Sequence, residues 1–173
     1  MLRIDINNIV LIGDSAGAQI TSNYAAIFTN PEYAALFNIV VPDIKVKAVG
    51  LNCGCYDGKK LYLTDEDQMF SGYIGIEKKA ASSELLEMID VAGHINSNFP
   101  PSFIISSKND FLLPMAEPMY KLLKSKNVPS KMNIYGKKKQ KEIAHVFSVN
   151  IDFNESKLCN DEQTDFFKHY LNQ

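Results

Sequence analysis

The stretch that decides the fold is IVLIGDSAG, residues 9–17, which is followed by a helix-like segment to about residue 28. It places the pattern G-x-S-x-G between an apolar run typical of a buried strand and a helix. In this context the chain turns so sharply that the serine is strained and only glycine fits two positions to either side. The sequence therefore predicts that Ser15 is presented as a nucleophile at the start of a helix. The turn around it is formed by Gly13, Asp14 and Gly17.

A carboxylate partner for this serine is predicted further along the chain. The G-x-S-x-G motif alone is weak evidence for a nucleophile, because five matching residues also occur by chance in strand-to-helix turns. A second catalytic element is therefore required to support the assignment of Ser15. Asp110 follows the strand-like segment 100–107 in the turn-forming pair Asn109-Asp110. A carboxylate just past the C-terminal end of a strand lies at the edge where open α/β sheets gather their functional groups. The alternative is that Asp110 caps the next helix, which Pro114 begins.

The third predicted member of the site is a histidine. His145 follows the strand-like segment 131–135 and a polar loop. From there an imidazole can take the serine proton while Asp110 holds it in one tautomer. His94 precedes a strand and approaches the opposite end of the sheet, and His169 lies in an amphipathic C-terminal helix, so neither is expected to take part. The chain order serine, aspartate, histidine is that of α/β hydrolases.

Four segments together resemble one known family. The elbow extended to Ala18 is similar to GDSAGG, with alanine in place of the last glycine. Segment 100–110 resembles a PP-strand-x-D element, segment 120–129 resembles a helix followed by a "GVP" turn, and segment 144–147 resembles HGF with Val146 in place of the glycine. These motifs resemble the hormone-sensitive-lipase-like branch of the α/β hydrolase superfamily, whose members are carboxylesterases, lipases and related acyl hydrolases of small or medium esters.

The resemblance implies an α/β fold with a mostly parallel sheet, in a single domain over residues 1–173 that begins just before the elbow and lacks the N-terminal strands. It also implies an ester hydrolase that works through an acyl-enzyme on Ser15, without metal or organic cofactor. His145 would be the general base and Asp110 its orienting partner, and the Ala16 N–H would donate to the oxyanion. The expected substrate is a small-molecule ester.

The family carries an HGG-type loop before the elbow that supplies a second oxyanion donor, whereas only 12 residues precede Gly13 here. Loss of one donor costs about 10²–10³ in turnover. A truncated or degenerate hydrolase half that serves in assembly or binding is therefore the alternative, and a peptidase of the same superfamily is a third. The elbow strand, 9–12, would lie at an open sheet edge, which favours pairing with another copy of the chain or with the missing N-terminal half.

Composition indicates one small domain. The chain has 173 residues, of which 46% are hydrophobic and 22% charged, and its net charge of -2 gives no reason to expect nucleic acid. No apolar run approaches the roughly 20 residues of a membrane span, and no signal peptide follows Met1. Three cysteines argue against a disulfide framework and favour a cytoplasmic location. Cys53 and Cys55, expected on one strand face, are assigned to structure rather than to metal.

Hydrophobic patterning predicts strands near residues 9–12, 46–51, 103–106 and 132–135. It predicts helices near residues 16–28, 82–89, 114–125 and 162–171. Segment 57–75 is too irregular for framework and is expected to pass over the C-terminal edge of the sheet, where it either lines an acyl pocket or covers the core. The lysine-rich run 137–141 beside His145 is expected to be a solvated loop, with attraction of anionic substrates as the alternative.

Overall fold

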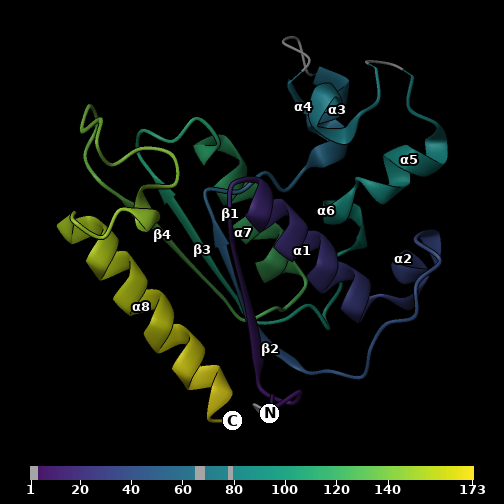
Figure 1. Cartoon of the computed structure of the whole chain (residues 1–173), viewed down its shortest axis with the longest axis horizontal. Helices are drawn as coiled ribbons and strands as arrows, with labels where there is room; N and C mark the ends of the chain where they lie inside the picture. The colour runs from purple at the N-terminus through teal and green to yellow at the C-terminus, as the bar shows by residue number, and fades with distance from the viewer. Residues whose placement is uncertain (1–3, 65–68, 78–79) are drawn as a thin grey trace.

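The computed structural model describes residues 4–64, 69–77 and 80–173 and contains a four-stranded parallel sheet (Figure 1). The strands lie in chain order, and each predicted strand is present with small changes at its ends. The α/β class with a parallel sheet is confirmed. The strands are β1 (Ile9–Asp14), β2 (Val46–Asn52), β3 (Ser102–Ser107) and β4 (Ser130–Tyr135).

Helices cover both faces of the sheet. On one face α1 (Ala16–Thr29) and α7 (Leu113–Ser125) pack on a core that includes Ile104 of β3. On the other face α8 (Asn154–Leu171) covers Phe103 and Ile105, the neighbours of Ile104 in the same strand. Successive β3 side chains therefore enter two different cores, which explains why this strand is apolar without alternation.

Helix α8 begins eight residues before the predicted start at residue 162. Its buried face is formed by small and polar side chains, among them Ser156, Cys159 and Gln163, so it carries little hydrophobic periodicity. The Gln163 amide Nε2 donates to Asn52 Oδ1 at 2.8 Å, and Asn52 Nδ2 donates to Gln163 Oε1 at 3.4 Å, so the two buried amides pair with each other. Polar pairing adds to the apolar packing of this helix, and hydrophobic patterning underestimates the length of α8 because several of its buried residues are polar or small.

Several short helices were not predicted by patterning. One of these helix starts does carry a sequence signal, an asparagine followed directly by a proline at residues 30–31. In the structure the Asn30 side chain caps this helix by accepting hydrogen bonds from two backbone N–H groups. Segment 57–75 is not irregular in its described part, because it contains two helices; residues 65–68 lie outside the description. Helices this short give too few turns for a periodic signal. The short helices that were not predicted are α2 (Pro31–Leu36), α3 (Gly58–Thr64), α4 (Met69–Ile74), α6 (Val91–His94) and the 3₁₀ turn η1 (Phe147–Val149). Helix α5 (Ser83–Met88) is also short but corresponds to the helix predicted near residues 82–89.

Strand β1 forms one edge of the sheet, as predicted. It pairs with β2, and in the described part of the chain no strand pairs with its other side. On this edge strand the Ile12 side chain is 53% exposed. Among the helices of the described residues, none is long and apolar enough to cross a bilayer.

Candidate active site

The turn between β1 and α1 has the predicted geometry. Ser15 lies at φ 55° and ψ -118°, a region that non-glycine residues rarely occupy, and its N–H donates to the Asn52 carbonyl of β2 at 2.9 Å. A Cβ on Gly13 would lie 2.2 Å from the Gly17 carbonyl oxygen, so only glycine fits at position 13. The second half of the glycine prediction is wrong, because a Cβ on Gly17 meets nothing within 4 Å.

This difference predicts opposite effects of two alanine substitutions. Gly13→Ala forces backbone apart and is expected to cost about 3 kcal/mol, near the upper end for overpacking, or about 6–12 °C in Tm for a domain of this size. Gly17→Ala adds a methyl group in open space within α1 and is expected to leave Tm unchanged or to raise it by a few degrees. Thermal unfolding followed by circular dichroism measures both. Equal melting temperatures for the two variants would contradict the clash.

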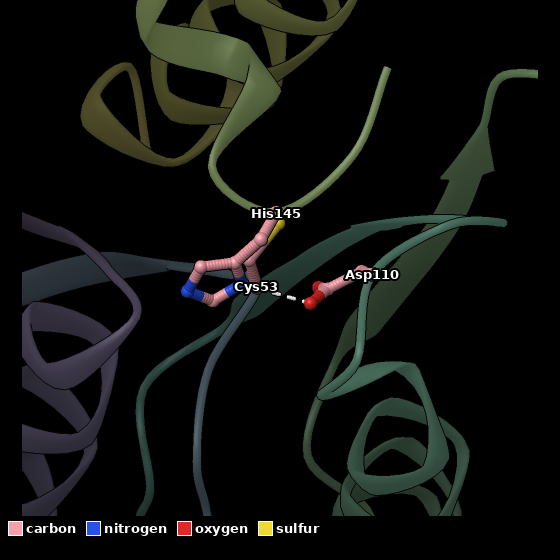
Figure 2. A group of neighbouring side chains, drawn as sticks. All are labelled: Cys53, Asp110 and His145. Carbon is pink, nitrogen blue, oxygen red and sulfur yellow. Dashed lines mark hydrogen bonds and ion pairs between the residues drawn. The ribbon is translucent and has the colours of Figure 1, made fainter. Parts of the chain in front are cut away.

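The structure brings Ser15, Asp110 and His145 together from three separate segments. His145 Nε2 lies 2.8 Å from Ser15 Oγ, and His145 Nδ1 lies 2.8 Å from Asp110 Oδ1. The Asp110 side chain is fully buried and that of His145 is 22% exposed. Figure 2 shows the aspartate and the histidine facing each other at the C-terminal edge of the sheet. A chain of hydrogen bonds thus connects a buried carboxylate to an accessible hydroxyl through one imidazole.

The Asp110 carboxylate faces His145, and the helix-capping alternative is wrong because Leu112 is the N-cap of α7. Its Oδ1 accepts from the Leu112 N–H at 2.9 Å in the turn before α7, besides facing His145. Its Oδ2 accepts from Ser106 Oγ at 2.8 Å. Helix α7 begins at Leu113, one residue before the expected Pro114. Both carboxylate oxygens are therefore held in place, and the Oδ1 side is directed at the imidazole.

Asn109 holds the loop that leads to His145, a role the sequence did not reveal. Its amide nitrogen lies 2.9 Å, 2.8 Å and 3.2 Å from the carbonyl oxygens of Lys137, Gln140 and Ile143. Its Oδ1 accepts from the Lys139 N–H at 2.9 Å. The lysine side chains of this run are exposed, as expected for a solvated loop. The neighbour of Asp110 in sequence thus fixes the approach to the histidine.

A second bridge connects the loop after His145 to the elbow. Ser148 Oγ donates to Asp14 Oδ1 at 2.8 Å, which gives the elbow aspartate a structural partner. Val146, in the position of the family's glycine, adopts φ 51° and ψ 30°. A β-branched residue in this left-handed region is strained, and strain of this kind persists only where surrounding contacts enforce it. The bonds on both sides of His145 supply that enforcement.

Cys53 lies under the imidazole and against Asp110 (Figure 2). It follows β2 at φ 47° and is 1% exposed. Burial, and secondarily the charge of Asp110, raises the pKa of its thiol well above the usual range. Cys53 and Cys55 do not share one face, because Cys53 belongs to the core under α8 and Cys55 to a cluster under α3 and α4. All three cysteines are free.

An apolar pocket opens beside Ser15. Its volume is about 180 Å³, and α3 and α4 supply part of its wall, which favours the acyl-pocket interpretation of segment 57–75. The Phe111 ring lies 4.4 Å from the His145 ring and joins the pocket to the site. The Ala16 N–H belongs to the first turn of α1, where N–H groups have no acceptor within the helix. The apolar lining consists of Leu61, Phe70, Tyr73, Phe111 and Leu112.

The other two histidines lie outside this group. The His94 ring stacks on Tyr33 at 4.0 Å and its Nε2 lies 3.2 Å from Glu87 Oε1. His169 lies on α8, where its Nε2 contacts the Gln173 side chain. The arrangement around Ser15 can therefore move a proton between a hydroxyl and a single imidazole, next to an apolar pocket and a helix N-terminus.

The model of the family described as α/β hydrolase fold matches residues 1–147. Among solved structures, esterase B from Lactobacillus rhamnosis with a tributyrin phosphonate is similar at 23% identity and a TM-score of 0.84, over 98% of this chain and 54% of that one. An esterase from Pyrobaculum calidifontis is similar at 18% identity and a TM-score of 0.67, over 96% and 54%. Acylaminoacyl peptidase from Pyrococcus horikoshii is similar at 19% identity and a TM-score of 0.67, over 96% of this chain and 25% of that one. Among curated proteins, none matches.

The chain spans about half the length of these esterases, and identities this low show a common fold. The family model itself covers most of the sequence, including the elbow, Asp110 and His145. The chain belongs to the α/β hydrolase family, in its hormone-sensitive-lipase-like branch.

Proposed function

We propose that the protein is a serine carboxylic-ester hydrolase that forms an acyl-enzyme on Ser15. The observation that carries the proposal is the position of His145, whose two ring nitrogens lie 2.8 Å from Ser15 Oγ and 2.8 Å from Asp110 Oδ1. The fold alone does not choose the reaction, because an acylaminoacyl peptidase shares it. The apolar pocket beside the hydroxyl and the family motifs favour an ester over a peptide.

The proposed reaction is a double displacement. Ser15 Oγ attacks the ester carbonyl carbon while its proton passes to His145 Nε2, and Asp110 stabilises the imidazolium. The Ala16 N–H donates to the oxyanion of the tetrahedral intermediate. His145 then returns the proton to the departing alcohol, which leaves the acyl group on Ser15. Water, deprotonated by the same imidazole, releases the acid and restores the enzyme.

The pocket predicts a preference for short acyl chains. Its volume of about 180 Å³ is close to that of cavities which bind one benzene ring. We expect kcat/KM for p-nitrophenyl butyrate to exceed that for the dodecanoate by about tenfold or more, because chain beyond the pocket gains no apolar contact. Phe70→Ala enlarges the pocket and should reduce the ratio of the two kcat/KM values. Leu158→Ala, on the distant surface of α8, should leave this ratio unchanged. Faster cleavage of the long ester by the wild type would contradict the assignment.

The second candidate function, a hydrolase half that serves in assembly, is favoured by the open edge of β1. We propose that another copy of the isolated chain covers this edge. Among the described residues no strand pairs with the outer side of β1, and Ile12 on this strand is exposed. Such an edge pairs readily with another strand. Because the matched esterases are about twice as long, pairing would also compensate for sheet that those proteins carry in one chain.

Light scattering at micromolar concentration tests this pairing. We expect a mass at least twice the 19.4 kDa of one chain. Ile12→Lys should restore a monomer, since a charge on an edge strand blocks strand addition, whereas Leu158→Lys on α8 should leave the association intact. A wild-type chain that is monodisperse at 19.4 kDa with cooperative unfolding would overturn the proposal.

We also propose a cytoplasmic location. The three cysteines are free and buried, and none forms a disulfide. Thiols that stay reduced suit a reducing compartment. An activity unaffected by strong reductant is the corresponding expectation.

A further inference from the structure

Cys53 lies within reach of the same two groups that position Ser15, yet the proposed reaction does not use its thiol. Cys53 Sγ, an Asp110 carboxylate oxygen and a His145 ring nitrogen all lie within 4.8 Å of one another. Figure 2 shows the cysteine and the aspartate converging on the histidine from different segments of the chain. One sulfur, one oxygen and one imidazole nitrogen form a donor set that suits a thiophilic divalent cation.

We propose that Cys53, Asp110 and His145 form an inhibitory site for a thiophilic divalent cation such as Zn²⁺ or Cd²⁺, which switches off the esterase. The inhibitory part of this inference rests on the proposed function of Ser15, whereas the binding part does not. From the sequence alone, Cys53 and Cys55 are assigned to structure rather than to metal. The partners that make Cys53 a ligand come instead from the ends of β3 and of the loop after β4.

The distances are compatible with coordination. Tetrahedral zinc with sulfur, nitrogen and oxygen ligands holds its ligand atoms about 3.3–3.8 Å apart, as follows from bond lengths of about 2.0–2.3 Å. To reach this spacing, the His145 Nδ1 and Asp110 Oδ1 atoms, which are 2.8 Å apart, must separate by about 0.5 Å, and a separation of 4.8 Å, the upper limit in the cluster, must close by about 1 Å. Ser106 Oγ and the Leu112 N–H already hold the carboxylate oxygens and would orient them toward the ion.

The charges also balance. Binding converts the thiol to a thiolate, so the thiolate and the Asp110 carboxylate together offset the two positive charges of the ion. The buried site, in which the Asp110 side chain is fully enclosed, then carries no net charge.

Occupation of the site removes the general base. In the proposed reaction His145 Nδ1 carries the hydrogen that faces Asp110, and the Nε2 lone pair receives the Ser15 proton. When the ion binds Nδ1, the proton of this nitrogen moves to Nε2 and the Cys53 proton leaves to solvent. One proton is released, the imidazole stays neutral, and no electrons are exchanged. Nε2 now carries a hydrogen and cannot accept the Ser15 proton, so acylation stops.

Cadmium binding to the Ser15→Ala chain tests the site without requiring activity. We expect one Cd²⁺ per chain by isothermal titration, together with an ultraviolet thiolate-to-cadmium absorption band. Both signals should disappear in Ser15→Ala/Cys53→Ser and persist in Ser15→Ala/Cys159→Ser, which removes a buried thiol outside the cluster. Mg²⁺, which prefers oxygen ligands, should not bind. Absence of the band, or its survival without Cys53, would overturn the site.

Inhibition is measured separately on the wild type. Cd²⁺ should slow the labelling of Ser15 by a fluorophosphonate by about 10²-fold or more, the contribution of general-base catalysis, and EDTA should reverse the effect. Binding without slower labelling would overturn the switch. A wild type that takes no label even without metal would instead refute the proposed function, and the cadmium titration would still decide the site. If the Cys53→Ser variant does not fold, Ser15→Ala/Asp110→Asn takes its place in the cadmium titration. We then expect the affinity for Cd²⁺ to fall at least tenfold, about the lower bound for the loss of a group that supports a bound metal.

Discussion

Replacing Ser15 by alanine is expected to bring ester cleavage down to the residual rate of a site without a nucleophile. Loss of the nucleophile costs on the order of 10⁶ in kcat where a serine hydrolase site is complete. Each oxyanion donor contributes about 10²–10³, so a site that works with the Ala16 N–H alone should lose only about 10³–10⁴. The size of the fall, measured with p-nitrophenyl butyrate, therefore also reports whether a second donor reaches the oxyanion.

Ser125→Ala is the matched control, because this serine is exposed on α7 and its hydroxyl donates to the Leu122 carbonyl in the same helix. It should retain the wild-type rate. Turnover in Ser15→Ala equal to that of Ser125→Ala would exclude Ser15 as the nucleophile and place the chemistry elsewhere in the pocket.

Asp110→Asn is expected to lower kcat by up to about 10⁴ while the fold persists. The amide is nearly isosteric, so it can still accept from the Leu112 N–H in the turn before α7. It removes the negative charge that stabilises the imidazolium. The neutral amide oxygen that stays on the Leu112 N–H orients the His145 Nδ1–H less strongly than the carboxylate does, so the productive tautomer is less favoured.

Asp165→Asn, an exposed carboxylate on α8, controls for the loss of one charge. Circular dichroism and Tm should show that both variants are folded. Wild-type turnover in a folded Asp110→Asn protein would reduce Asp110 to its function in the turn before α7, and the general base would then lack an orienting partner.

The parts of the site that the sequence predicts are those with local signals. The elbow needs a glycine at position 13 for contact reasons, and the strand ends place Asp110 and His145 at one edge of a parallel sheet. The four strands are likewise visible as short apolar runs. Gly17 shows the limit of such motifs, because the structure gives no steric reason for glycine there.

The parts that the sequence missed depend on contacts between distant residues. Asn109 bonds residues about 30 positions away, and Gln163 is paired with Asn52 across 111 positions. No local sequence pattern encodes such partners. Hydrophobic patterning predicts that a polar residue is exposed, even where pairing with a distant partner buries it. Cys53 is the same case, since only the fold brings its thiol under His145. Once Asp110 and His145 are known to lie beside it, Cys53 is reassigned from a structural residue to a potential metal ligand.

The most direct test of the account is covalent labelling of the intact chain with a fluorophosphonate, followed by peptide mass mapping. The reagent reacts with a serine only when an adjacent base activates it, which is the function assigned to His145. The account predicts one label per chain, on the peptide that contains Ser15, and its loss in Ser15→Ala and His145→Ala. Labelling that persists in Ser15→Ala, or a folded wild type that takes no label, would contradict it.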